Sequence, residues 1–284
     1  MSWLALSLSL SMAWSDIGSK QALVCEAAQL EYCLASLPIT VRKQLPSHLS
    51  SYHQAIGHRG AMVIPVSDPN ISGLILLSPE RIPKISLVTL AGKVESLTLT
   101  QTDKMTLWHE LGHLHVKALE ELGLLKETSA YQHEWIADCY LTWRAAKEEL
   151  SVDLAWQQYH RRNMSVMKDV SFMSHWTVPV LSQLLSRYKV KDLAQFDTFE
   201  ALMSDFLPDL VEKDQDTLDE FSSLIHRTFS TRTSQSLPNY MYWRKPALGH
   251  YVEPTLVKLL GKKEASLWLQ QQSMLANSVT ETSF

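Results

Sequence analysis

The stretch Thr106-Leu107-Trp108-His109-Glu110-Leu111-Gly112-His113-Leu114 decides how this chain is interpreted. Its apolar residues recur at the three- and four-residue spacing of a helix. At about 100° per residue, one buried face of that helix is formed by Leu107, Leu111, Leu114 and Ala118. His109 and His113 lie together on the opposite side. We therefore expect a helix that packs through its leucines and turns two histidines toward a cleft.

Two histidines at this spacing have a direct chemical use. Residues four apart stand one turn above each other, so His109 and His113 can bind one zinc ion at about 2.0–2.1 Å. Glu110 projects from a neighbouring face and can accept the proton of a zinc-activated water as general base. Gly112 leaves room for a neighbouring backbone to approach.

A catalytic zinc needs a third protein ligand and an open fourth position. The candidate ligand is Glu134, on the next expected helix, in the sequence Glu134-Trp135-Ile136-Ala137-Asp138. Glu134 and Asp138 are four residues apart and face the same way. One carboxylate can bind the metal while the other accepts the second N–H of a ligating histidine. The break at Gly123 allows this helix to fold back against the first.

Together, His109-Glu110-x-x-His113 and Glu134-x-x-Ala-Asp138 resemble the motifs of the gluzincin zinc metallopeptidases, which include thermolysin-like and prenyl-protease-like enzymes. The resemblance covers residues 106–141 of 284. It implies one zinc ion per chain, held by His109, His113 and Glu134, with Glu110 as general base and Asp138 behind the ligands. It also implies a zincin-like fold, in which a small sheet flanks the active-site helix.

Enzymes of this kind usually stabilise the oxyanion of the reaction with a His, Tyr or Arg side chain. Downstream candidates are His226, Tyr240, Tyr242, Arg244, His250 and Tyr251. From this group we select Tyr242 and His250 as further catalytic residues. Loop packing is the alternative use of aromatic side chains near prolines.

Four short runs rich in β-branched and aliphatic residues precede the motif. They are Ala61–Val66, Leu74–Leu77, Ile85–Leu90 and Val94–Thr100. The last two flank a short turn with Gly92 and predict a β-hairpin. A substrate backbone could pair with an exposed strand within Ala61–Leu77.

Helical spacing dominates elsewhere. Expected helices are Ser19–Leu37, Lys104–Leu122, Ala130–Leu150, Val152–Lys168, Val178–Tyr188, Phe196–Phe206, Thr217–Phe229 and Pro254–Gln272. Asp103 and Ser129 are candidate N-caps, the latter with Gln132 completing a capping box. The sequence predicts an α+β fold, predominantly helical, with a small β-sheet before the active-site helix. Residues 16–150 would form the catalytic core and residues 151–284 a helical part that completes the cleft.

The N-terminal region bears on the cellular compartment. Residues 1–15 are apolar and serine-rich, and Ala13-Trp14-Ser15 resembles a signal-peptide cleavage site. No Lys or Arg precedes Lys20, so the positive n-region is missing and an N-terminal helix is the alternative. Cys25 and Cys33 can form a disulfide in an oxidising compartment or remain buried thiols on a helix. These features favour export, periplasmic or secreted, over a cytoplasmic location.

Charge and hydropathy exclude other classes. The net charge is −4 and the pI about 6.3, so no basic surface for nucleic acid is expected. Apolar runs of the roughly 18 residues needed for a membrane span are missing from the sequence. His115 is expected to be packed, His133 to face solvent and Cys139 to be neither ligand nor nucleophile. Five other histidines have no metal-binding spacing: His48, His53, His58, His160 and His175.

Three functions remain after these exclusions. The first is a zinc metalloendopeptidase acting on peptide or protein substrates through Glu110. The second is a non-catalytic binding or regulatory protein that zinc stabilises. The third is a helical interaction protein in which the motif is accidental.

Overall fold

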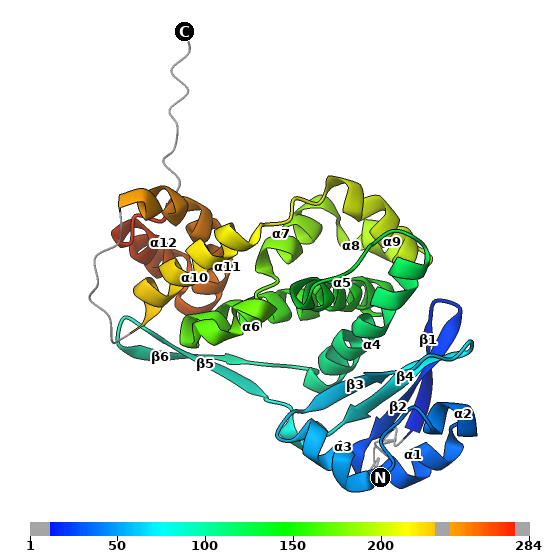
Figure 1. Cartoon of the computed structure of the whole chain (residues 1–284). Helices are drawn as coiled ribbons and strands as arrows, with labels where there is room; N and C mark the ends of the chain where they lie inside the picture. Colours follow the sequence, from blue (N-terminus) through cyan, green and yellow to red (C-terminus); the bar gives the residue numbers. More distant parts are fainter. Residues whose placement is uncertain (1–11, 231–238, 276–284) are drawn as a thin grey trace, which may run out of the picture.

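A four-stranded β-sheet forms the N-terminal part of the protein (Figure 1). The computed structural model describes residues 12–230 and 239–275. The strands are β1 (Met12–Ile17), β2 (Lys20–Glu26), β3 (Ala61–Pro65) and β4 (Ile71–Leu77), in the order β1-β2-β4-β3. β1 and β3 run antiparallel to their neighbours, whereas β2 and β4 are parallel. β3 is therefore an edge strand.

The two central strands, β2 and β4, are buried on both faces because they carry apolar residues at successive positions. On β2, Leu23 and Cys25 point to one core, while Ala22 and Val24 point to another. Three short helices cover the first face: α1 (Leu30–Ser36), α2 (Ile39–Arg42) and α3 (Leu49–Ile56). Helix α4 (Thr102–Glu121) covers the second face and carries the two histidines.

Glycines set the distance of α4 from its neighbours. A Cβ on Gly73 of β4 would lie 2.8 Å from Cδ2 of Leu114, so the glycine lets α4 settle on the sheet. On the other side of α4, a Cβ on Gly112 would lie 2.5 Å from Cα of Ala137 in α5 (Ala130–Glu149). The expectation that Gly112 leaves space for a neighbouring backbone is confirmed.

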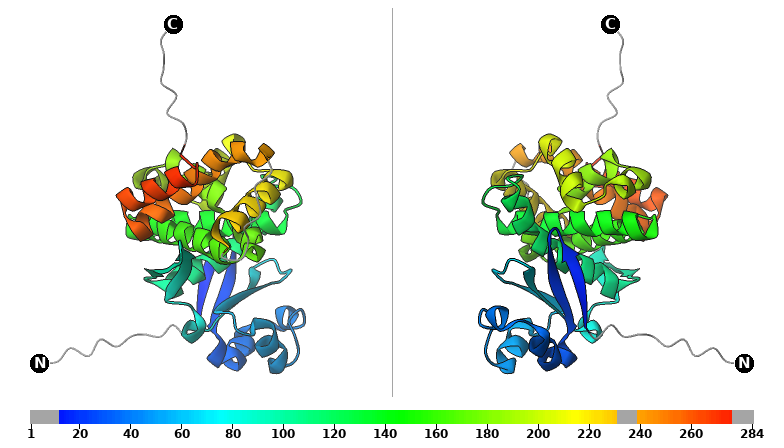
Figure 2. Two further views of the ribbon diagram at one scale, coloured as in Figure 1. Left: turned by 90° about the vertical axis from the view of Figure 1, so that its left-hand side faces the viewer. Right: turned by 90° about the vertical axis from the view of Figure 1, so that its right-hand side faces the viewer.

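The C-terminal half is helical (Figure 2). Its helices are α6 (Asp153–Lys168), α7 (Val178–Arg187), α8 (Val190–Gln195), α9 (Phe199–Phe206), α10 (Gln215–Phe229), α11 (Lys245–Leu260) and α12 (Lys262–Gln271). Short 3₁₀ helices are η1 (Ala27–Gln29), η2 (Pro79–Arg81), η3 (Val170–His175), η4 (Leu207–Asp209) and η5 (Asn239–Arg244). Helices α7–α9 share the core of α4 and α5, so packing is continuous across residue 150.

The expected hairpin is present but stands apart from the main sheet. β5 (Ile85–Leu90) and β6 (Lys93–Thr98) form a separate two-stranded sheet. Its buried residues, including Val88 and Leu97, pack with the C-terminal helices. In Figure 1 the hairpin extends from the main sheet toward α10–α12.

The predicted α+β class is confirmed, and so is the capping box at Ser129. The helix expected over Ser19–Leu37 is wrong in its first half, where Lys20–Glu26 forms β2. A strand buried on both faces has no alternation that would distinguish it from a buried helix. The N-cap of α4 is Gln101, in the left-handed region, rather than Asp103.

The last expected helix, Pro254–Gln272, is also wrong. The structure has two helices here, because Gly261 adopts a φ of +81° between α11 and α12. Pro254 lies inside α11 and does not begin it. A proline inside a helix loses one backbone hydrogen bond, and the buried residues Val252 and Leu256 anchor the helix on either side.

Cys25 and Cys33 form a disulfide that joins β2 to α1. The alternative of two thiols on one helix is therefore wrong. The expected cleavage site, Ala13-Trp14-Ser15, lies inside β1, so the N-terminal helix is wrong for residues 12–15. Cleavage after Ser15 would remove four of the six residue pairs between β1 and β2. The rest of the predicted signal segment, residues 1–11, lies outside the described residues.

Within the described parts of the chain, every helix is too short or too polar to cross a membrane.

Gly112→Ala is expected to lower the free energy of unfolding by about 2 kcal/mol. The new methyl group would press on the backbone of α5, and overpacking costs about 1–3 kcal/mol, more than alanine's helix propensity restores. Urea denaturation measures the change. Lys117→Ala, at an exposed position of the same helix, is the control and should change stability by about 0.5 kcal/mol or less. Equal stability of Gly112→Ala and the wild type would contradict the close approach of α4 and α5.

Candidate metal centre

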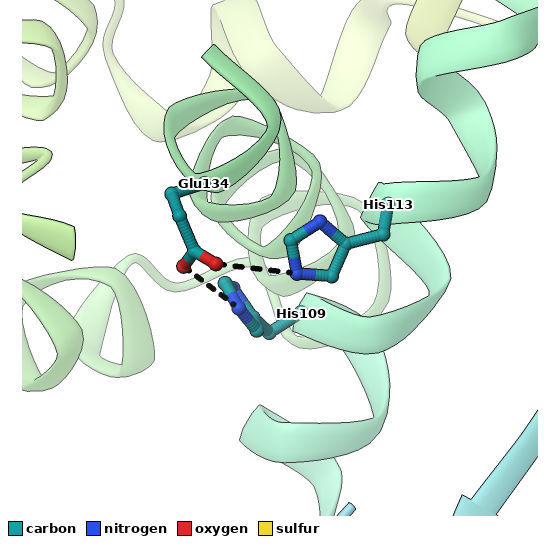
Figure 3. A group of neighbouring side chains, drawn as sticks. All are labelled: His109, His113 and Glu134. Atoms are coloured by element: carbon teal, nitrogen blue, oxygen red, sulfur yellow. Dashed lines mark ion pairs between the residues drawn. The ribbon is translucent and has the colours of Figure 1, made fainter. Parts of the chain in front are cut away.

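Three predicted ligands converge where α4 packs against α5 (Figure 3). The Nε2 atom of His109 lies 3.4 Å from Oε2 of Glu134, and Nε2 of His113 lies 3.8 Å from Oε1 of the same carboxylate. One nitrogen or oxygen of each residue lies within 4.8 Å of the other two. The helical spacing of the histidines and the folding back of α5 together bring these groups to one point.

The donor set fits a zinc ion. Tetrahedral zinc with bonds of about 2.0–2.1 Å places its ligand atoms roughly 3.4 Å apart. The two shortest separations here, 3.4 Å and 3.8 Å, are close to that value. Two imidazoles and one carboxylate are also the ligands of one type of catalytic zinc site, which keeps its fourth position open.

Asp138 lies behind the ligands and is fully buried. Its Oδ1 accepts a 2.8 Å hydrogen bond from Nδ1 of His109, which leaves Nε2 of that histidine facing Glu134. The structure therefore contains the hydrogen bond between Asp138 and a histidine that the sequence predicted. The same carboxylate accepts bonds from Gln158 Nε2 at 2.8 Å and from Thr177 Oγ1 at 2.6 Å. These contacts fix the orientation of the His109 ring.

Arg162, on α6, is a residue of this centre that the sequence did not reveal. Its Nε donates to Oδ2 of Asp138 at 2.8 Å, and its Nη2 donates to Oε2 of Glu134 at 2.9 Å. The guanidinium therefore braces both carboxylates of the second motif. An arginine within an ordinary amphipathic helix gives no signal of such a role, because its partners come from another part of the chain.

Burial and charge set the protonation states. Burial disfavours the charged form of His109, but the Asp138 carboxylate outweighs it and raises the pKa to about 9. Burial and the charge on His109 lower the pKa of His113 to about 3. Burial raises the pKa of Glu134, yet hydrogen bonding to His109 and nearby positive charges lower it to about 2. A metal at Nε2 of His109 must displace a proton, whereas His113 and Glu134 are already in their ligand forms.

The centre opens into a cavity of about 1130 Å³. Its wall includes β3, the segment around η2, and parts of α4, α5, α6 and η3. Glu110 lines this cavity, and burial raises the pKa of its carboxyl although the charge on His109 opposes the change. Residues beyond 150, including Arg162 and His175, complete the wall.

Two further histidines lie closer to the centre than their sequence spacing indicated. His175, on η3, lines the cavity and has its Nε2 3.5 Å from Oε1 of Glu134. His133 was expected to face solvent, but it is partly buried and also lines the cavity. Its Nε2 lies 2.9 Å from Oγ1 of Thr128. Tertiary folding brings both residues to the site.

Tyr242 and His250 do not line the cavity. Tyr242 is exposed on η5, where the ammonium of Lys245 lies over its ring. His250 is exposed on α11 and its ring contacts Tyr251. Both belong to the C-terminal helices rather than to the motif helices, so we withdraw their assignment to the catalytic site. Of the aromatic residues in this segment, Tyr251 packs against the core of the C-terminal helices, whereas Tyr242 and Trp243 are exposed.

The packed role expected for His115 is confirmed. It is buried, donates from Nδ1 to Glu200 at 2.8 Å and stacks on Tyr140. Cys139 is a buried free thiol in the core of α4 and α5.

Asp138→Asn should lower the free energy of unfolding by about 3–5 kcal/mol, because it removes the charge that compensates the buried Arg162 guanidinium. Urea denaturation followed by circular dichroism measures the loss. Asp197→Asn is a suitable control, since the Asp197 side chain is fully exposed. A loss as small as that of the control would show that the buried ion pair does not hold the centre together.

Comparison of the chain with protein-family models, curated proteins and solved structures finds no match.

Proposed function

We propose that this protein is a zinc-dependent metallopeptidase of gluzincin type with a zincin-like core, which hydrolyses peptide bonds in peptide or protein substrates. The observation that carries the proposal is the convergence of His109, His113 and Glu134 at the wall of a large cavity. The ligand atoms come from helices that the two motifs predicted separately, and their separations suit tetrahedral zinc.

Zinc bound by these residues would polarise the scissile carbonyl and lower the pKa of an attacking water toward about 7. Glu110 follows His109 on α4 and lines the cavity, where it can accept a proton and pass it to the leaving amine. Burial raises the pKa of Glu110, which makes its carboxylate a stronger base. Asp138 keeps the His109 ring oriented with Nδ1 as its donor.

His175 replaces Tyr242 and His250 in this proposal as the residue that stabilises the oxyanion. Its side chain is about half exposed, lines the cavity and lies beside Glu134. An imidazole N–H in this position can donate to an oxygen on which negative charge develops. The 3₁₀ helix η3 carries it, next to the end of α6.

The edge strand β3 offers a place for the substrate backbone. Within the interval Ala61–Leu77, β4 is already paired on both sides, whereas β3 has one free edge. Ala61, Met62 and Val63 all line the cavity. An extended peptide could add to this edge with alternate side chains directed into the cavity. Pro65 lacks an N–H and limits pairing at the end of the strand.

Glu110→Gln should bind one zinc per chain and lose peptide hydrolysis by about 10²–10⁴-fold, because the ligands remain while the proton acceptor is removed. Zinc content by atomic absorption and cleavage of quenched peptides measure the two properties on one preparation. Glu120→Gln, also on α4 and lining the cavity, is the matched control and should retain activity.

Undiminished hydrolysis by zinc-loaded Glu110→Gln would refute the mechanism. Stoichiometric zinc without chelator-sensitive hydrolysis in the wild type would instead identify a non-catalytic, zinc-stabilised protein. Failure to bind zinc would leave only a motif of accidental origin.

We also propose that the protein functions outside the reducing cytoplasm, periplasmic or secreted, and the Cys25–Cys33 disulfide supports this location. In protein from its native cells, alkylation under denaturing conditions without reductant should label Cys139 alone. Mass spectrometry reads out the label, with a reduced sample as control. Label on all three cysteines would contradict the export proposal.

A further inference from the structure

We propose that Arg161 forms a carboxylate-binding subsite in the wall of the cavity, which selects substrates with an acidic side chain or a free C-terminal carboxylate near the scissile bond. This inference rests on the proposed peptidase function and specifies its substrate class. Arg161 and Arg162 are neighbours on α6, and the difference between their hydrogen-bond and ion-pair partners points to a ligand for Arg161.

Arg162 and Arg161 are adjacent in sequence but have different partners. Arg162 pairs with the carboxylates of Asp138 and Glu134 through its Nε and Nη2 atoms, at distances of 2.8–3.1 Å. Arg161 also lines the cavity, yet within residues 12–230 and 239–275 its guanidinium makes one hydrogen bond, a long one of 3.5 Å to Oε1 of Gln158. Among the described residues, no carboxylate oxygen comes within 4.0 Å of Arg161 to form an ion pair.

Arg161 is partly buried and forms no ion pair within the described residues, although Asp138, Glu134 and Glu110 supply negative charge nearby. A guanidinium has five N–H donors, and most of those on Arg161 have no partner among the described residues. Burial and the adjacent charge of Arg162 lower the pKa of Arg161 to about 10, so it remains a cation at neutral pH. A carboxylate from a ligand would compensate this charge with two parallel hydrogen bonds.

Arg161 is also connected to the proposed metal centre through Gln158. Gln158 donates from Nε2 to Asp138 and so presents its own oxygen to Arg161. The subsite is thereby linked to the carboxylate that orients His109. Arg161, Glu110 and Glu134 line the same cavity, and the two carboxylates oppose the lowering of the pKa of Arg161.

The charge of the cavity wall agrees with an anionic ligand. Its basic residues are Lys20, Arg59, Arg81, Lys117, Arg161 and Arg162. Its acidic residues are Glu110, Glu120, Glu121 and Glu134. The wall therefore carries an excess of positive charge on a chain whose net charge is −4, and zinc would add to this excess.

Arg59, in the segment before β3, adds a second positive charge to the cavity wall near Glu110. Its Nη2 donates to the backbone oxygen of Ala55, and its charge opposes the rise in the pKa of Glu110 that burial causes. Positive charge therefore reaches the proposed general base from two parts of the wall. A substrate that brings a carboxylate to Arg161 would fit this field better than a neutral or basic peptide.

The test uses amidated, fluorescein-labelled peptides of alanine and glycine that carry one glutamate at successive positions, each matched with a glutamine peptide. A third set has glutamine and a free C-terminal carboxylate. Binding is measured by anisotropy with zinc-loaded Glu110→Gln protein, and kcat/KM is measured with the wild type. One carboxylate set should bind about tenfold or more tightly than the neutral set, since charge-assisted hydrogen bonds discriminate to that degree.

The preference should disappear in Arg161→Gln, weaken in Arg161→Lys and persist in Arg42→Gln, an exposed arginine on α2. Preference for glutamate peptides would assign an acidic side chain, and preference for the free terminus would assign the C-terminal carboxylate. Equal binding of all sets, or a preference that survives Arg161→Gln, would overturn the subsite. Carboxylate-selective binding without hydrolysis by the wild type would refute the peptidase function but retain the subsite. Hydrolysis without a preference for carboxylates would retain the peptidase function but overturn the subsite.

Discussion

The buried carboxylate of Asp138 is the contact on which the rest of the centre depends. It joins four elements, because its partners are His109 on α4, Gln158 and Arg162 on α6, and Thr177 at the start of α7. A carboxylate removed from water is tolerated only when donors surround it, and here they do so at 2.6–3.1 Å. The helices must therefore pack in one arrangement, and that arrangement brings the histidines and Glu134 together. Stability and site geometry have a common origin in this residue.

The sequence predicted the proposed ligands and Asp138, but it did not predict the other residues that surround the centre. The sequence identified His109, His113, Glu134 and Asp138 because their roles depend on spacing within single helices, where four residues make about one turn. Arg162, His175 and His133 contribute through tertiary contacts that have no periodic signature. Tyr242 and His250 were selected from the aromatic-rich segment 240–251, but both side chains are exposed and lie outside the cavity wall.

The fold shows the same difference between features with a periodic sequence pattern and features that depend on tertiary contacts. The helices α4 to α7 were found nearly at their true ends, and α4, α6 and α7 each have an apolar and a polar face. The capping box at Ser129 marked the start of α5. Lys20–Glu26 was mistaken for helix because both faces of β2 are covered, which removes the alternation of an ordinary strand. The break at Gly261 depends on a positive φ, a property that the surrounding apolar pattern does not encode.

The two glycine contacts of α4 have a consequence for the choice of metal ion. Gly73 lets the Leu114 side chain of α4 pack directly on β4, and Gly112 lets the backbone of α5 pack directly on α4. The histidines and Glu134 thus project from two backbones that have little freedom to separate. A metal ion bound at the proposed site would need a radius that suits the spacing of these two backbones. The two glycines would thereby influence which ion the proposed centre accepts.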